Sequence, residues 1–97
     1  GLNISFKSVD RMDAALQRLK WKRFDVVLLD LTLPDSQGLA TFQTLHAAAN
    51  DTPVIVLSGE EDRELAVQAV REGAQDYLSK QKADSDALIR SIRYAVE

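Results

Sequence analysis

Apolar and polar positions change their period several times along the chain. Residues 2–6 alternate between apolar and polar side chains, which predicts a short strand with one polar face. Apolar residues at helical spacing follow over residues 12–19, with Asp10 as the expected N-cap. The almost continuously apolar run at residues 24–29 predicts a strand covered on both faces, as in a parallel sheet.

The same alternation continues to the end of the chain. The turn at residues 34–38 leads into a predicted helix at 39–49, and a predicted strand at 54–57 follows. Apolar residues at helical spacing over 65–70 predict a further helix, which Gly73 ends. A strand at 77–78 and a helix from residue 84 or 85 complete the series. Four βα units with short links predict an α/β fold, an open parallel sheet with helices on both faces. We expect residues 1–97 to form one domain.

Composition narrows the class of protein. The chain has 97 residues, 45% of them hydrophobic and 28% charged, as in ordinary globular domains. A net charge of -3 argues against direct nucleic-acid binding, and no apolar run approaches the ~20 residues of a membrane span. The absence of cysteine excludes disulfides and fits a reducing compartment, so we expect a cytoplasmic protein.

Three polar side chains follow three predicted strands. Asp30, Ser58 and Lys80 come after the strands that end at Leu29, Leu57 and near Leu78. Each has an ordinary explanation alone, as a turn residue, a cap or a surface lysine. Carboxyl ends of neighbouring parallel strands share one edge of a sheet, so we expect a carboxylate, a hydroxyl and an ammonium to converge there, which suits a phosphoryl group.

Several segments resemble the receiver domain of two-component response regulators, a flavodoxin-like family. These are residues 24–39, with an apolar strand, Asp30 and a loop containing Pro34 and Gly38; residues 54–59, with Ser58 at the Ser/Thr switch position; and residues 71–80, which end at Lys80. The resemblance implies that Asp30 takes a phosphoryl group from a histidine kinase or phosphotransfer protein. It implies a signalling domain rather than an enzyme acting on an external substrate.

The resemblance also implies roles for neighbouring residues. Asp30 and the backbone carbonyl of Thr32 would bind Mg²⁺, and Lys80 would pair with the phosphoryl group. Ser58 and Tyr77 would act as the switch. A further implication is that Thr32 and Glu60 tune the hydrolysis of the acyl phosphate.

The chain departs from the family at its beginning. Receivers have five βα units, and the first, whose central strand ends in an acidic pair that completes the Mg²⁺ site, is missing here. We therefore expect weakened Mg²⁺ binding and a domain truncated at its N-terminus. Asp35 is interpreted as a turn residue. The last helix resembles one that continues towards an output domain, linked or separate, and a homodimer through that helix and its neighbouring strand face is a further expectation.

Two other functions remain open. A pseudo-receiver would bind partners without being phosphorylated, because the acidic pair is missing. A fragment of an aspartate-nucleophile phosphatase would also carry Asp30 after an apolar strand, although Thr32 stands where that family has a second Asp. His46 is interpreted as structural, and the basic residues around Trp21 as a solvated link with a packed indole.

Overall fold

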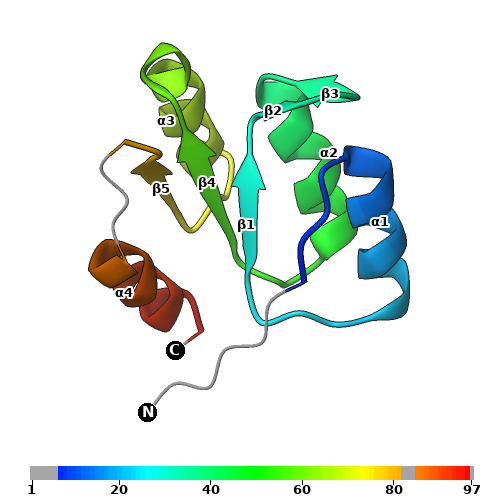
Figure 1. Cartoon of the computed structure of the whole chain (residues 1–97). Helices are drawn as coiled ribbons and strands as arrows, with labels where there is room; N and C mark the ends of the chain where they lie inside the picture. Colours follow the sequence, from blue (N-terminus) through cyan, green and yellow to red (C-terminus); the bar gives the residue numbers. More distant parts are fainter. Residues whose placement is uncertain (1–6, 82–84, 97) are drawn as a thin grey trace.

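A computed structural model of the chain describes residues 7–81 and 85–96 (Figure 1). Helices and strands alternate along these residues as the apolar pattern predicts. In chain order the elements are α1 (Met12–Trp21), β1 (Val27–Asp30), β2 (Thr32–Leu33), β3 (Ser36–Gln37), α2 (Leu39–Ala49), β4 (Val54–Ser58), the 3-10 helix η1 (Glu60–Asp62), α3 (Arg63–Arg71), β5 (Asp76–Ser79) and α4 (Ser85–Val96). The strand predicted at residues 2–6 lies outside the described residues.

Strands β1, β4 and β5 form a parallel sheet in the order β1-β4-β5. Asp30 lies opposite Leu57 on β4, and Ser58 lies opposite Ser79 on β5. The carboxyl ends of the three strands therefore lie along one edge of the sheet. The predicted α/β class with a parallel sheet is confirmed.

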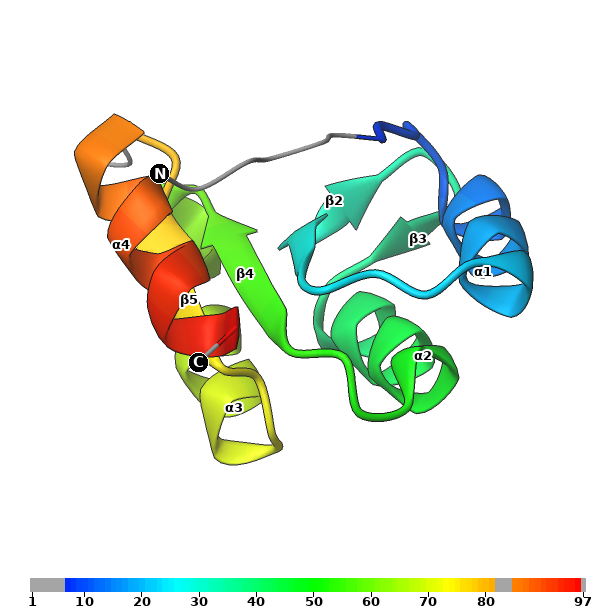
Figure 2. The ribbon, with the colours of Figure 1, turned by 90° about the horizontal axis from the view of Figure 1, so that it is seen from below.

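Helices cover both faces of the sheet. Figure 2 shows α4 on one side and α2 and α3 on the other, with α1 packed beside α2. Burial of apolar side chains between these layers is the main force that holds them together. The buried core residues that form one cluster are Met12, Leu29, Leu31, Phe42, Leu45, Ala49, Val54, Val56, Ala66, Ala69 and Ala74.

One edge of β1 has no paired strand among residues 7–81 and 85–96. Leu29 is fully buried, but Val26, Val27 and Leu28 are only half-buried. A mainly apolar cavity of about 360 Å³ runs beside them, and residues 7–9 and α1 line its other side. The prediction of a strand covered on both faces agrees with the helices on either side of the sheet, but the outer edge of this strand faces a groove, so most of its side chains are only half-buried.

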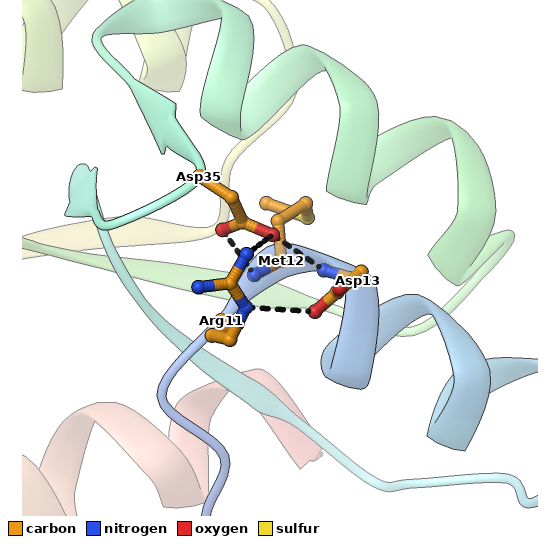
Figure 3. A network of polar contacts seen from close by, with 4 residues as sticks. All are labelled: Arg11, Met12, Asp13 and Asp35. Carbon is orange, nitrogen blue, oxygen red and sulfur yellow. Dashed lines mark hydrogen bonds and ion pairs between the residues drawn. The ribbon is translucent and has the colours of Figure 1, made fainter.

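The N-terminus of α1 is capped from a distant loop (Figure 3). The helix begins at Met12 after Arg11, whose extended backbone occupies the N-cap position, so the prediction of Asp10 as N-cap is wrong. The carboxylate of Asp35 accepts hydrogen bonds from the backbone N–H of Met12, at 2.7 Å, and of Asp13, at 3.0 Å. Its oxygens thus satisfy two of the four N–H groups that a helix leaves free at its start.

The predicted turn at residues 34–38 overlaps a small antiparallel hairpin formed by residues 32–37. Thr32 pairs with Gln37, and Leu33 with Ser36, so Asp35 lies at the tip of the hairpin. The backbone N–H of Gly38 then donates to the carbonyl of Leu31 at 2.9 Å. The hairpin turns the chain back towards α2 and brings its tip to the start of α1.

Gly73 ends the α3 segment in a conformation that favours glycine. Its φ is +126°, and a Cβ added there would lie 2.8 Å from Cε1 of His46. The His46 ring stacks on Phe42 with their centroids 4.9 Å apart. His46 therefore has a packing role, as the sequence indicates.

Candidate functional site

Asp30 and Lys80 meet at the carboxyl edge of the sheet. Asp30 is the last residue of β1, and Lys80 directly follows β5. The Nζ atom of Lys80 lies 2.6 Å from Oδ2 of Asp30, and the backbone N–H of Thr32 donates to Oδ1 at 2.9 Å. The Asp30 and Lys80 side chains are 35% and 43% exposed, so a reactant can reach both from solvent.

Ser58 lies at the same edge, at the end of β4. Its backbone carbonyl accepts a hydrogen bond from the N–H of Lys80 at 2.8 Å, which fixes the backbone of Lys80 beside β4. Ser58 is only 3% exposed, and so lies under the surface that Asp30 and Lys80 share. The sheet register therefore brings together the three strand ends that the sequence singles out.

The other predicted site residues surround this edge. Tyr77 lies within β5, is half-buried and packs against the core cluster. Thr32 is exposed at the start of β2, and Glu60 is exposed at the start of η1, one residue after Gly59. In the sequence, Thr32 lies two residues after Asp30, and Glu60 lies two residues after Ser58.

The described residues do not form a complete magnesium site. Among residues 7–81 and 85–96, no three His, Cys, Asp or Glu side chains gather where they could hold a metal ion. Asp30 supplies one carboxylate, which Lys80 and the N–H of Thr32 already contact. Mg²⁺ prefers six oxygen ligands, so Asp30 and a Thr32 carbonyl would have to be completed by water and phosphoryl oxygens.

Asp35 is a structural residue that the sequence interpretation missed. The hydrogen bonds from the N–H groups of Met12 and Asp13, with a smaller contribution from the Arg11 guanidinium, lower the pKa of Asp35 below its ordinary value of 3.8. An Arg11 nitrogen lies 3.8 Å from Oδ2 (Figure 3). Asp35 is therefore more than the turn residue expected, because it joins the loop after Asp30 to α1.

Comparison with known families identifies the chain. The aspartate–lysine pair lies at the carboxyl edge of a parallel sheet, which is where open α/β sheets bind their ligands. The family profile described as "Response regulator receiver domain" matches residues 2–93. The chain belongs to the response regulator receiver domain family.

Relatives and solved structures support this assignment. The chain is 44% identical over 72 residues to the C4-dicarboxylate transport transcriptional regulatory protein DctD of Pseudomonas aeruginosa, which covers 74% of this chain and 15% of DctD. It is 32% identical over 96 residues to the regulatory protein LuxO of Vibrio vulnificus, which covers 99% of this chain and 20% of LuxO. The chain thus spans a small part of these relatives.

Among solved structures, the receiver domain of NtrX from Brucella abortus superimposes with a TM-score of 0.82 at 30% identity, covering 93% of this chain and 76% of that one. An N-terminal signal receiver domain from Bacteroides fragilis gives a TM-score of 0.81 at 26% identity, covering 92% of this chain and 73% of that one. The flavodoxin-like receiver fold is thereby shown.

The family places the chain in two-component signal transduction. Response regulators pair with histidine kinases and carry output domains, and receiver domains generally bind Mg²⁺ at the phosphorylation site. This role is a signalling one and does not support the phosphatase alternative. Within residues 7–81 and 85–96, no helix has the length and apolar character required to cross a membrane.

Proposed function

We propose that Asp30 is the phosphoacceptor of this receiver domain and that its phosphorylation switches the surface formed by β5 and α4. The observation that carries the proposal is the 2.6 Å pair between the Asp30 carboxylate and the Lys80 ammonium at the edge where the strands end. The donor is a histidine kinase or a phosphotransfer protein. The proposal includes a cytoplasmic location.

The chemistry follows from the two groups. A carboxylate oxygen of Asp30 attacks the phosphorus of a phosphohistidine, a P–O bond forms, and the P–N bond to the imidazole breaks. Lys80 then has a phosphoryl oxygen as its partner in place of the free carboxylate, and its positive charge stabilises the added negative charge. Positioning and charge, rather than proton transfer by this chain, account for the step.

The switch follows from the burial of Ser58. Its side chain is 3% exposed, so the hydroxyl can donate to a phosphoryl oxygen only if its loop moves. We propose that this movement makes room for Tyr77, which is half-buried, to rotate further inward. Thr32 and Glu60, both exposed beside the edge, are proposed to adjust the access of water to the acyl phosphate.

Magnesium binding is expected to be weak in this chain. Within residues 7–81 and 85–96, the proposed ligands are the carboxylate of Asp30 and the backbone carbonyl of Thr32. When bound, the ion supplies positive charge that offsets the charge of the phosphoryl oxygens. Phosphorylation should therefore need more Mg²⁺ than a receiver with a complete acidic cluster needs.

A homodimer is part of the same proposal. Three apolar or aromatic side chains of α4 are exposed, Ile89 at 36%, Val96 at 47% and Tyr94 at 73%. Ile89 and Val96, seven residues apart, share one side of α4, and this side fits pairing through α4 and the adjoining strand face in the phosphorylated state. Sedimentation velocity with and without beryllofluoride checks this part, and an unchanged monomer would contradict it.

The phosphorylation test uses intact-mass spectrometry. The chain is incubated with Mg²⁺ and acetyl phosphate, and we expect an adduct of one phosphoryl group. Asp30→Asn should abolish it, whereas Asp25→Asn, an exposed carboxylate before β1, should keep it.

A pseudo-receiver is the second candidate, because the described residues lack a metal-binding cluster. It predicts no adduct and no chemical-shift changes with Mg²⁺ and beryllofluoride. Shift changes that spread from Asp30 to Tyr77 would exclude it. No adduct at any Mg²⁺ concentration would sink the phosphoacceptor proposal for this chain.

A further inference from the structure

A second cavity lies at the opposite end of the sheet from Asp30. It measures about 290 Å³ and is lined by the end of α1, the link to β1, and Ala48, Ala49, Asn50 and Thr52 at the end of α2. These segments precede β1 and β4, and both strands run away from them towards Asp30 and Ser58. A strand of four residues is roughly 13 Å long, so this cavity is separate from the phosphoacceptor edge.

Three cationic side chains line this cavity. They are Lys20, Lys22 and Arg23, and in the part of the chain that the structure describes none of them forms an ion pair. All three are exposed. The cavity therefore concentrates positive charge on a chain whose net charge is -3.

Aromatic rings hold two of these cations in place. The ammonium of Lys20 lies 5.4 Å from the centroid of the Trp21 ring, and that of Lys22 lies 5.8 Å from the centroid of Phe24. Cation–π contacts at these distances restrict the side chains without neutralising them. Their charges stay available to an external anion, and less side-chain entropy is lost on binding.

Trp21 is the exposed aromatic residue of this cavity. Its side chain is 78% exposed, so the prediction of a packed indole is wrong. A large apolar ring beside unpaired cations is the kind of anchor that dominates protein interfaces. Binding would bury much of the ring and neutralise the three charges together.

We propose that this basic cavity, formed around Lys20, Trp21, Lys22 and Arg23, binds an acidic peptide segment of a partner protein. Carboxylates of the segment pair with the three cations, and an aliphatic side chain between them packs on the indole. The side-chain amide of Asn50, which also lines the cavity, adds a hydrogen-bond donor. This interaction does not rest on phosphorylation of Asp30.

A peptide fits these observations better than a nucleic acid or a nucleotide. Outside the cavity the chain is acidic and repels an extended polyanion. The four glycines, at positions 1, 38, 59 and 73, form no phosphate-binding cluster in the sequence. A short acidic segment matches the small basic area and can continue past it along the surface.

Trp21 is the only tryptophan of the chain, so its fluorescence reports on the cavity. The probe is the capped peptide EELEE, titrated into the full 97-residue chain, with the capped peptide QQLQQ as its uncharged control. We expect a saturable change in fluorescence with EELEE alone. The affinity should weaken as salt is raised from ~0.05 M to ~0.3 M.

Charge-removing variants test the assignment to this cavity. Lys20→Gln, Lys22→Gln and Arg23→Gln together should weaken EELEE binding at least tenfold. The matched control combines Arg63→Gln, Arg71→Gln and Arg90→Gln, which are exposed cations outside the cavity and should leave binding unchanged. Asp30→Asn should also leave binding unchanged, which separates this result from the proposed phosphorylation.

Three outcomes would overturn the proposal. The first is no saturable change with EELEE in the folded chain, as judged by circular dichroism. The second is equal binding of QQLQQ, or equal weakening by the two triple variants. The third is tighter binding of ATP or inorganic phosphate than of EELEE, which would identify a phosphate site instead.

Discussion

The carboxylate of Asp35 lies 2.7 Å from the backbone nitrogen of Met12, although the two residues are 23 positions apart in the sequence. This bond fixes the hairpin after Asp30 to the first turn of α1. It caps the helix and also closes the loop that begins at the proposed phosphoacceptor. Asp35 therefore contributes to stability and to the position of the loop.

Removing the cap should destabilise the domain in a graded way. Asp35→Asn keeps one acceptor oxygen, whereas Asp35→Ala removes both, so the unfolding temperature should fall more for Ala. Asp51→Asn, at an exposed carboxylate, is the matched control and should change the unfolding temperature little. Thermal unfolding followed by circular dichroism measures the unfolding temperature of all three variants. An equal fall in unfolding temperature for the Asp35 and Asp51 variants would contradict a capping role.

The cap should also make stability depend on pH. The pKa of Asp35 is lowered in the folded state by the N–H groups of Met12 and Asp13, from an ordinary value of 3.8. Its stabilisation is therefore fully present above about pH 4 and is lost as the pH falls through the lower folded pKa. Urea unfolding from neutral to acidic pH should show the difference between wild type and Asp35→Asn shrinking in that range. A difference independent of pH would exclude this linkage.

Three glycines should respond differently to alanine. Gly59 has a negative φ and open space, so Gly59→Ala should change the free energy of unfolding by less than ~1 kcal/mol. Gly38→Ala meets no neighbouring atom but must hold φ +78° and ψ -158°, a backbone region that is essentially restricted to glycine, so it should cost about 1–3 kcal/mol. Gly73→Ala adds a contact of 2.8 Å with His46 and should cost more than ~2 kcal/mol.

A double variant separates the two causes at Gly73. In a His46→Ala background the steric contact is removed, and Gly73→Ala should then cost less than it does in the wild type, leaving the backbone strain of φ +126°. Denaturant unfolding of the four chains in this cycle measures the coupling. A cost at Gly73 that does not change with His46 would refute the steric explanation.

Hydrogen exchange should report on the free edge of β1. The N–H of Val27 donates to the carbonyl of Pro53 at 2.9 Å, so it points towards β4. Strand alternation directs the N–H of Leu29 to the same side and those of Leu28 and Asp30 to the groove. We expect the backbone N–H groups of Leu28 and Asp30 to exchange at least ~10-fold faster than those of Val27 and Leu29. Equal protection would show that a strand, such as the one predicted at residues 2–6, occupies this edge.

The Asp30–Lys80 pair should matter for phosphorylation far more than for stability. Both side chains are more than a third exposed, at 35% and 43%, so Lys80→Gln should change the free energy of unfolding by less than ~1 kcal/mol. The same variant should reduce the phosphoryl adduct at least tenfold. Lys22→Gln, an exposed cation at the other end of the sheet, should alter neither quantity. A strongly destabilised Lys80→Gln chain would mean that the pair is structural.

Local periodicity predicted the four helices and the strands β1, β4 and β5, but not the β2–β3 hairpin or η1, whose segments are too short to carry a period. The order of the strands was sufficient to bring Asp30 and Lys80 together. The elements follow from the period of short segments. The meeting of the two residues follows from the rule that the carboxyl ends of neighbouring parallel strands lie at one edge of the sheet. The Asp35 cap could not be predicted, because an acceptor 23 residues from its helix leaves no local pattern. The exposure of Trp21 was also missed, since an indole in a basic link gives no sign of which surface it faces.

Asp76 ties the last helix to the sheet, since its Oδ2 accepts a hydrogen bond from the Ser91 hydroxyl at 3.0 Å. Asp76 begins the short strand that Lys80 follows, so this strand connects the helix anchor at one end with the ammonium at the other. Because Lys80 and the Asp76–Ser91 bond lie at the two ends of the same short strand, we expect a displacement of Lys80 on phosphorylation to change the position of α4. The outward-facing Tyr94 would be carried along with it.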